Sequence, residues 1–287
     1  MMTVPAVLSP RLAIEVDRSR LVNLLHFETY VHRHLDWRGP LDWLGRKPYL
    51  IVESGDELLA ALACPPEPPG VAWIRLFASA HRFNLHEAWG TLWPLALSQL
   101  RDLPVSQAAA IPLQDWFRDL LAANQFKRTH NVVVLAWRPD ASDLPAESRT
   151  SPNLRPMREG DVDGVVDVDR NAFALLWQNS REAVSLALKQ AGLATVIEDT
   201  GRILAFQIST RGAQGLHLAR LATHPGFQGR GLATSLVRYV QLQVLHRKGT
   251  LLTVNTQDNN APSLALYKKL AFSLTGEQFP VYQFDLN

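Results

Sequence analysis

Residues 218–245 read LARLATHPGFQGRGLATSLVRYVQLQVL, and this stretch decides the fold. Its apolar start predicts a strand, which Pro225 must end because proline fixes φ and has no N–H donor. Apolar side chains then return at the spacing of one helix face. They stand at Leu232, Leu236, Val240 and Val244. The stretch therefore predicts a strand, a loop and a helix that starts near Gly231.

The loop between strand and helix carries two glycines, Gly229 and Gly231. Glycine adopts positive φ without a Cβ clash, so backbone N–H groups can converge there. The first four amides of a helix lack partners within the helix, and the helix dipole places positive potential at that end. Together with the forked guanidinium of Arg230, these groups predict a phosphate-binding turn.

Three kinds of phosphate-binding loop share these features. A Walker loop requires Gly-Lys-Ser/Thr before the helix, which the stretch lacks, and a dinucleotide fingerprint requires a third glycine where Thr234 stands. The remaining pattern is Gln-x-x-Gly-x-Gly/Ala after a strand ending in His-Pro, formed by Gln228, Gly231 and Ala233. It resembles the acetyl-CoA loop of the GNAT family of N-acetyltransferases. The alternative is a glycine-rich turn that only lets helix and strand pack closely.

A second segment strengthens the resemblance. Asn260, Ser263 and Leu266-Tyr267, followed by Ala271-Phe272, are similar to the other GNAT signature, Asn-x-x-Ser-x-x-Leu-Tyr. The chain departs from the family at Ala271, where glycine is usual, and this departure concerns the end of a helix. The two signatures make the resemblance specific over residues 153–287.

Periodicity predicts the same order of elements in both halves, although the first half has no clear opening strand. In the second half we expect strand 153–157, helices 162–173 and 181–191, strands 194–197, 203–208 and 218–223, a helix from 231, strand 251–255, a helix after 260 and strand 279–284. In the first half we expect helix 18–35, strands 48–52, 58–64 and 71–77, helix 85–100 interrupted at Pro94, strand 105–111, helix 114–123 and strand 132–137. The expected fold class is α/β, with tandem GNAT-like domains that are each a mostly antiparallel mixed sheet flanked by helices. An unrelated α/β domain is the alternative for the first half.

Residues 138–152 mix proline, serine and charge, which is typical of a linker. We therefore expect a degenerate GNAT-like domain over 1–139, a linker over 140–152 and a catalytic GNAT domain over 153–287. In the first half, the counterpart of the acetyl-CoA loop is residues 78–84, which contain no glycine. Their backbone cannot form the same phosphate seat.

The resemblance implies roles for individual residues. The main chain of Leu221, Ala222 and Thr223 would hold the pantetheine arm of acetyl-CoA. The loop residues Gln228, Gly229, Arg230, Gly231, Leu232 and Ala233 would hold its pyrophosphate. Asn260 would touch the cofactor, cap the next helix, or do both. Tyr267 would be the catalytic acid that protonates the CoA thiolate, the alternative being a core residue.

The amine acceptor must lose a proton, because its pKa near ~10 keeps it charged at pH 7. His217 and Glu198 are candidates for that base by strand position, and a structural or surface role is the alternative for each.

Composition limits the partners. The chain has 287 residues, 47% hydrophobic and 20% charged, which is typical of a soluble globular protein with room for two domains. A net charge of +2 without a run of Lys and Arg argues against nucleic acid. No apolar run reaches membrane-spanning length and residues 1–10 do not read as a signal peptide, so we expect no membrane partner and a cytoplasmic location.

Cysteine, histidine and tryptophan usage adds three expectations. Cys64 is the one cysteine, which excludes an internal disulfide and reads as a packed strand residue. No His or Cys pair has metal-ligand spacing, so we expect no metal. Most of the eight tryptophans precede residue 138, and we expect some of these rings to face a partner surface.

The expected function is transfer of an acetyl group from acetyl-CoA, as co-substrate, to a primary amine of a small molecule or protein. The alternative is a non-catalytic module that binds or senses acyl-CoA. The intact loop and Tyr267 favour the enzyme, the amine acceptor is not identified, and a homodimer is left open.

Overall fold

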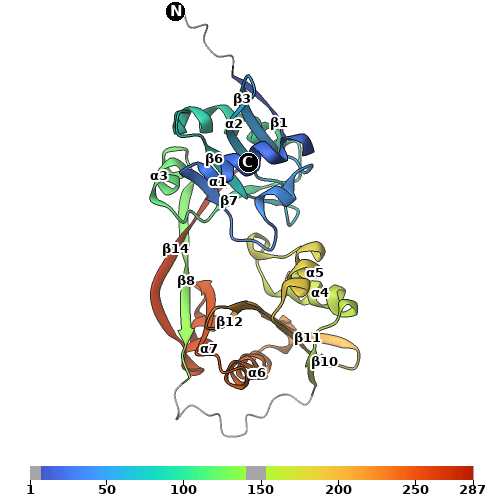
Figure 1. Ribbon diagram of the computed structural model, residues 1–287. Helices are drawn as coiled ribbons and strands as arrows, with labels where there is room; N and C mark the ends of the chain where they lie inside the picture. Colours follow the sequence, from blue (N-terminus) through green and yellow to red (C-terminus); the bar gives the residue numbers. More distant parts are fainter. Residues whose placement is uncertain (1–7, 140–152, 287) are drawn as a thin grey trace, which may run out of the picture. The chain divides into compact units, whose positions relative to one another are not determined.

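The computed structural model describes residues 8–139 and 153–286. The chain forms two compact units, Met1–Thr129 with Pro280–Asn287, and His130–Phe279. Helices flank mixed sheets in which antiparallel pairs prevail, so the predicted α/β class is confirmed (Figure 1). The predicted domain limits, 1–139 and 153–287, stay a prediction, and the predicted linker, 140–152, lies outside the described residues.

The second unit follows the predicted order of elements. They are β9 (Leu154–Pro156), α4 (Val162–Ala172), α5 (Arg181–Gln190), β10 (Leu193–Asp199), β11 (Arg202–Gly212), β12 (Gly215–Thr223), α6 (Leu232–His246), β13 (Leu251–Gln257), α7 (Ala261–Lys269) and the start of β14 (Ser273–Asp285). Helices α4 and α5 lie on one side of β10 to β12, and α6 lies on the other (Figure 1). Leu216 and Leu218 pack against the apolar stripe of α6, because alternate strand residues share one face of a sheet.

The first unit has a similar order, except that strand β2 stands where the second unit has helix α5, and that one strand is divided into β5 and β6. Its elements are β1 (Ser9–Leu12), α1 (Arg18–Phe27), β2 (Tyr30–Arg33), β3 (Tyr49–Ser54), β4 (Glu57–Ala63), β5 (Val71–Trp73), β6 (Leu76–Ser79), α2 (Leu85–Arg101), β7 (Gln107–Ala110), α3 (Asp115–Ala123) and the start of β8 (Lys127–Trp137).

Three local predictions for this unit were wrong. The helix predicted over 18–35 ends at Phe27, because Tyr30–Arg33 pairs its backbone with β6 instead. The strand predicted over 71–77 divides, since β5 pairs with β7 and β6 pairs with β4. Helix α2 continues through Pro94.

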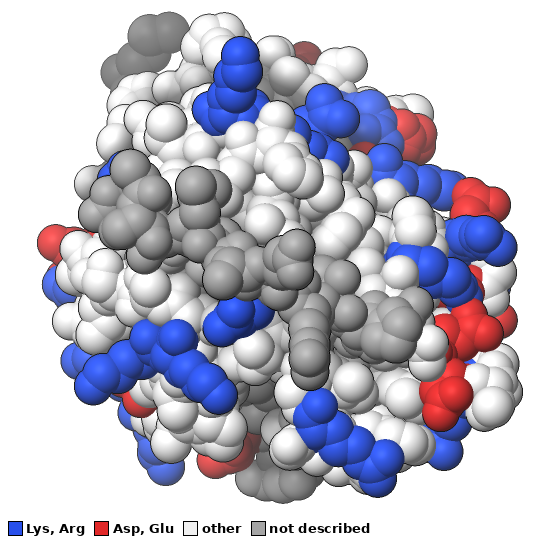
Figure 2. All heavy atoms as spheres, turned by 90° about the horizontal axis from the view of Figure 1, so that it is seen from below, with Lys and Arg blue, Asp and Glu red and all other residues white. Residues whose placement is uncertain are grey.

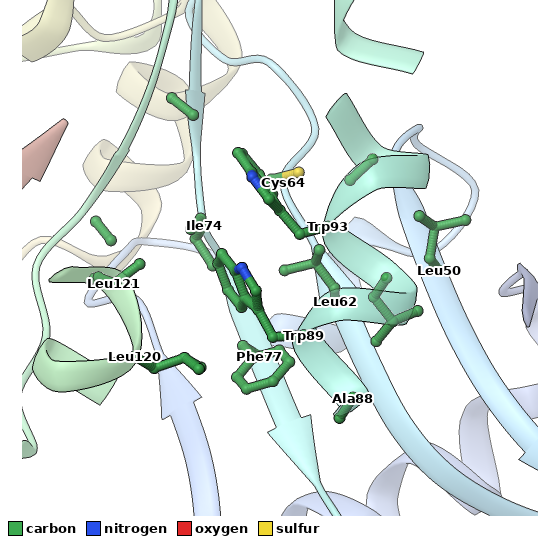
Figure 3. Packing of buried hydrophobic residues seen from close by; sticks show 14 of the residues in the cluster. Leu50, Leu62, Cys64, Ile74, Phe77, Ala88, Trp89, Trp93, Leu120 and Leu121 are labelled. Atoms are coloured by element: carbon green, nitrogen blue, oxygen red, sulfur yellow. The ribbon is translucent and has the colours of Figure 1, made fainter. Parts of the chain in front are cut away.

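Large aromatic rings fill the core of the first unit (Figure 3). Trp89 stacks on Trp93 with ring centroids 5.3 Å apart and meets Phe77 edge-on at 5.1 Å. Most of the tryptophans that precede residue 138 are core residues, and the expectation that some of these rings face a partner surface stays a prediction. Buried rings are Trp43, Trp73, Trp89, Trp93 and, in the second unit, Trp137. Cys64 lies in the same cluster, and burial raises the pKa of its thiol to about 12, so it is a packing residue as predicted.

Each unit takes a strand from the other half of the sequence. Strand β13 pairs antiparallel with β8, matching Leu252 to Trp137. Strand β7 pairs antiparallel with the end of β14, matching Ala110 to Tyr282. Chain order alone would predict β7 beside β8 and β13 beside β14. The last strands of the two halves are therefore exchanged.

Candidate active site

A gap opens between two parallel strands of the second unit. Strands β12 and β13 pair from Gly215 opposite Leu251 to Leu218 opposite Val254, and no further, although both continue. The register against β11 shifts at the same point, so Ala219 has no partner across the pair and forms a bulge. Along 219–223, the edge of β12 that faces the gap has no strand partner in the described chain. A ligand could therefore take the place of a strand partner along this edge.

The predicted pantetheine residues lie on this edge. Leu221, Ala222 and Thr223 are the last three residues of β12, and each pairs with β11 on the opposite edge. An extended ligand in the gap would meet their backbone as another strand would.

The predicted pyrophosphate loop follows directly. Gly229 and Gly231 have φ of +75° and +80°, and Gly231 is the N-cap of α6. A Cβ built on either glycine would meet nothing within 4 Å, so backbone conformation, rather than crowding, requires glycine. No side chain caps the first turn of α6, where Leu232 and Ala233 lie. The helix end therefore offers amide groups and positive potential to an anion.

Side chains of the loop tie it to its neighbours and add charge. Gln228 Nε2 donates to the carbonyl oxygen of Thr223 at 3.3 Å, and Arg230 Nη2 donates to that of Gly226 at 3.4 Å. The Arg230 and Arg202 guanidinium groups lie 4.9 and 5.3 Å from the ring centroid of Phe227. This holds two cations beside the uncapped helix end.

Positive charge extends beyond the loop. No Asp or Glu occurs between Asp199 and Asp258. The cations in that span are Arg202, Arg211, Arg220, Arg230, Arg238, Arg247 and Lys248. Figure 2 shows Lys and Arg spread over the face seen from below, with Asp and Glu at its margins. Such a field attracts polyanions.

The second signature places two predicted residues near the gap. Asn260 caps α7, since its Oδ1 accepts from the Ser263 amide at 3.2 Å, while its Nδ2 donates to Gln257 Oε1 at 3.2 Å. Tyr267 is only 4% exposed and lies in the cluster that contains Leu218 and Val254, the last pair before the gap. Among the described residues, no hydrogen bond of its hydroxyl is found. Burial raises the pKa of Tyr267, so the hydroxyl keeps its proton at neutral pH.

The two candidate bases differ. His217 stands opposite Thr253, two residues before the bulge, and its Nδ1 lies 2.9 Å from Thr253 Oγ1. Burial lowers the pKa of His217 below its usual value, so the ring is neutral at pH 7. Glu198, on β10, is instead held in an ion pair by Arg155, on β9. The structure favours a structural role for Glu198.

The corresponding place in the first unit is closed. The edge of β6 is occupied by β2, with Tyr30 opposite Ser79 and Arg33 opposite Leu76. Asn84 also caps α2, since its Oδ1 accepts from the amides of His86 and Glu87 at 3.0 and 3.1 Å. In the first unit, the corresponding strand edge and helix end thus already have partners within the chain.

Over residues 8–139 and 153–286, no cluster of three or more His, Cys, Asp or Glu side chains is arranged to hold a metal ion. None of the helices in that part of the chain is long and apolar enough to cross a membrane.

Comparisons with known proteins agree with this geometry. The model of the acetyltransferase (GNAT) family matches residues 163–272. A search of curated proteins found no match. A GCN5-related N-acetyltransferase from Sphaerobacter thermophilus is 15% identical with a TM-score of 0.59, over 99% of this chain and 98% of its own.

Two further solved structures share the fold. The tandem GNAT protein from the clavulanic acid biosynthesis pathway is 15% identical with a TM-score of 0.61, over 98% of both chains. A probable N-acyltransferase from Enterococcus faecalis V583 is 9% identical with a TM-score of 0.73, over 98% of this chain and 72% of its own. The chain therefore contains an acetyltransferase domain of the GNAT family at residues 163–272, within a fold that a tandem GNAT protein shares.

Proposed function

We propose that the protein transfers the acetyl group of acetyl-CoA to a primary amine of a small molecule or protein, and that the second unit does the chemistry. The observation that carries this proposal is the unpaired edge of β12 leading into the uncapped end of α6. The first can hold an amide-rich arm such as pantetheine, and the second can hold a pyrophosphate.

In this proposal, Leu221, Ala222 and Thr223 bind the pantetheine arm through their main chain, and 228–233 bind the pyrophosphate. Asn260 contacts the cofactor from the far side of the gap while it caps α7. Arg202 and Arg230, beside the loop, favour a cofactor that carries several phosphate charges. The cytoplasm, as a source of acetyl-CoA, is the proposed location.

The reaction forms an amide C–N bond and breaks the thioester C–S bond. The amine must first lose a proton, and His217 is the better placed base because it is neutral and stands beside the gap. The departing sulfur must gain a proton, and Tyr267 is the proposed donor because its raised pKa keeps the hydroxyl protonated. From ammonium to amide, nitrogen gives up two protons: one passes through the base to solvent before attack, and one leaves after attack on the carbonyl. The sulfur takes up one proton, so the balanced reaction yields the amide, coenzyme A thiol and one released proton.

The first unit is proposed to bind no acetyl-CoA, since β2 and Asn84 occupy the corresponding groups. Calorimetric titration with acetyl-CoA should therefore give about one site per chain. A value near two would overturn this part of the proposal.

Gly231→Asp should abolish binding, because the variant places a strained side chain and a negative charge at the pyrophosphate seat. Gly201→Asp is the matched control, since Gly201 also has φ of +80° and open space around its Cβ but lies in the turn between β10 and β11. Equal affinity in both folded variants would show that the loop is only a packing turn. Thiol release from acetyl-CoA with a panel of amines then separates an enzyme from a protein that only binds acyl-CoA.

A further inference from the structure

A buried ion pair ties the open strand to the segment between α4 and α5. Arg220 follows the bulge residue Ala219 on β12, and its Nε donates to Asp169 Oδ2 at 2.7 Å. The Asp169 side chain, on α4, is 0% exposed and that of Arg220 is 14% exposed. Burial lowers the pKa of Arg220, yet the guanidinium stays charged because its ordinary pKa is so high.

The same two side chains hold the segment 173–179 at three points. Arg220 Nη2 donates to the carbonyl oxygen of Trp177 at 2.6 Å, and its Cζ lies 3.5 Å from the ring centroid of Phe173. Asp169 Oδ1 accepts from the backbone amide of Asn179 at 2.8 Å. The fork of an arginine can serve a carboxylate, a carbonyl and an aromatic face together, which a lysine cannot.

Trp177 reaches across the gap. Its carbonyl is bound by Arg220 of β12, while its ring meets that of His130 on β8 edge-on, with centroids 5.7 Å apart. In the sheet, β13 lies between β12 and β8. Trp177 therefore contacts both strands that flank β13, at the level where β12 and β13 have separated.

We propose that Arg220 and Asp169 are positioning residues that hold segment 173–179 over the gap, so that the amine acceptor meets the acyl group against Trp177. This inference rests on the proposed function, which makes the gap the place where the acyl-CoA arm binds. Arg220 then couples two partners of the reaction, because the strand that it stands on binds the acyl-CoA arm and the segment that it holds shapes the entry of the amine.

The first test observes the segment without any turnover. The protein is labelled with 5-fluorotryptophan, and the ¹⁹F resonance of Trp177 is assigned by its loss in Trp177→Phe. Arg220→Lys should shift or broaden this resonance, since a lysine cannot hold Asp169, Trp177 and Phe173 together. Arg181→Lys is the matched control, because Arg181 on α5 also pairs with an aspartate of α4, Asp163, but both side chains are exposed, at 63% and 77%. The control should leave the resonance unchanged.

The second test separates acceptor from cofactor. With an amine that supports thiol release, Arg220→Lys should raise KM for the amine about tenfold, while kcat and the Kd of acetyl-CoA change less than about threefold. If Arg220→Lys folds poorly, Arg220→Met with Asp169→Leu removes both charges, leaves no unpaired charge buried, and should show the same pattern.

An unchanged Trp177 resonance, or an unchanged amine KM, in a folded variant that lacks the pair would overturn the inference. If wild-type protein binds acetyl-CoA but acetylates no amine, the proposed function fails instead, and the ¹⁹F result still decides whether the pair holds the segment.

Discussion

Arg155 donates to both carboxylate oxygens of Asp161, each at 2.8 Å. In the first unit, Arg11 does the same to Asp17, at 2.7 Å and with the same spacing of six residues. Each arginine also binds a glutamate: Arg155 binds Glu198, and Arg11 binds Glu53. Each glutamate stands where its own strand shifts register against the next strand. The two units thus repeat a side-chain device as well as an order of elements, which supports their description as a tandem fold.

The ion pair of Arg155 with Asp161 should make the stability of the protein depend on pH. The hydrogen bonds from Arg155 lower the pKa of Asp161, so its contribution is present above the unfolded pKa near ~3.9 and is lost as pH falls through the folded pKa. Asp161→Asn should lower the free energy of unfolding by about 1–2 kcal/mol at pH 7, and by less as pH falls below about 4. Urea denaturation at several pH values measures this. Asp163→Asn, in an exposed pair, should cost under about 0.5 kcal/mol. An equal loss for Asp161→Asn at every pH would contradict the assignment.

Ala271, which stands where the family usually has glycine, has a strained backbone conformation. It has φ of +64°, a region that costs a residue with a Cβ roughly 1–2 kcal/mol. Ala271→Gly should therefore raise the free energy of unfolding by about 1 kcal/mol, measured by denaturation. Ala265→Gly, inside α7, should lower it by about 1 kcal/mol. Destabilisation by both substitutions would show that the strain is absorbed elsewhere.

Tyr267→Phe keeps the ring in its cluster and removes only the hydroxyl. Because a thiol of pKa near ~8.5 leaves moderately well without help, kcat should fall by roughly 10²-fold rather than to zero. The Kd of acetyl-CoA and the melting temperature should stay nearly constant. Wild-type turnover in this variant, under conditions where chemistry limits the rate, would make Tyr267 a core residue only.

A base at His217 predicts a defined pH profile. The base works when neutral, and burial lowers its pKa, so kcat/KM for the amine should fall on the acid side only below about 6.5. His217→Gln should reduce kcat by roughly 10²-fold or more and remove that limb. Glu198→Gln should change stability and leave the limb in place, since Glu198 serves Arg155. Loss of the acid limb in Glu198→Gln, and its retention in His217→Gln, would reverse the two roles.

The exchanged strands predict that neither half folds well alone. Residues 1–139 lack Tyr282, at the end of β14, and Leu286, which follows it, and both belong to the core of the first unit. This fragment should aggregate, and co-expression with 153–287 should give a soluble complex on size exclusion. Co-expression with 153–279, which lacks the final strand, should not rescue it. A soluble, cooperatively unfolding 1–139 monomer would refute the need for exchange.

Local chemistry explains what the sequence could predict. The loop and the elements beside it could be predicted, because their limits depend on the backbone preferences of Pro225, Gly229 and Gly231 themselves. Strand β2 was not, because four residues carry no period and only the edge of β6 makes them a strand. The bulge at Ala219 and the partner of Arg220, 51 residues earlier on α4, likewise depend on distant segments.

The pairing of β7 with β14 also orders events during synthesis. The first unit is translated before the second, yet its strand β7 waits for residues 280–286, which are translated after the rest of the second unit. Until then β7 presents an unpaired edge, the kind of surface on which aggregation and chaperone binding begin. The second unit receives β8 before its own strands exist. The first unit can therefore be completed only after the second unit has been translated.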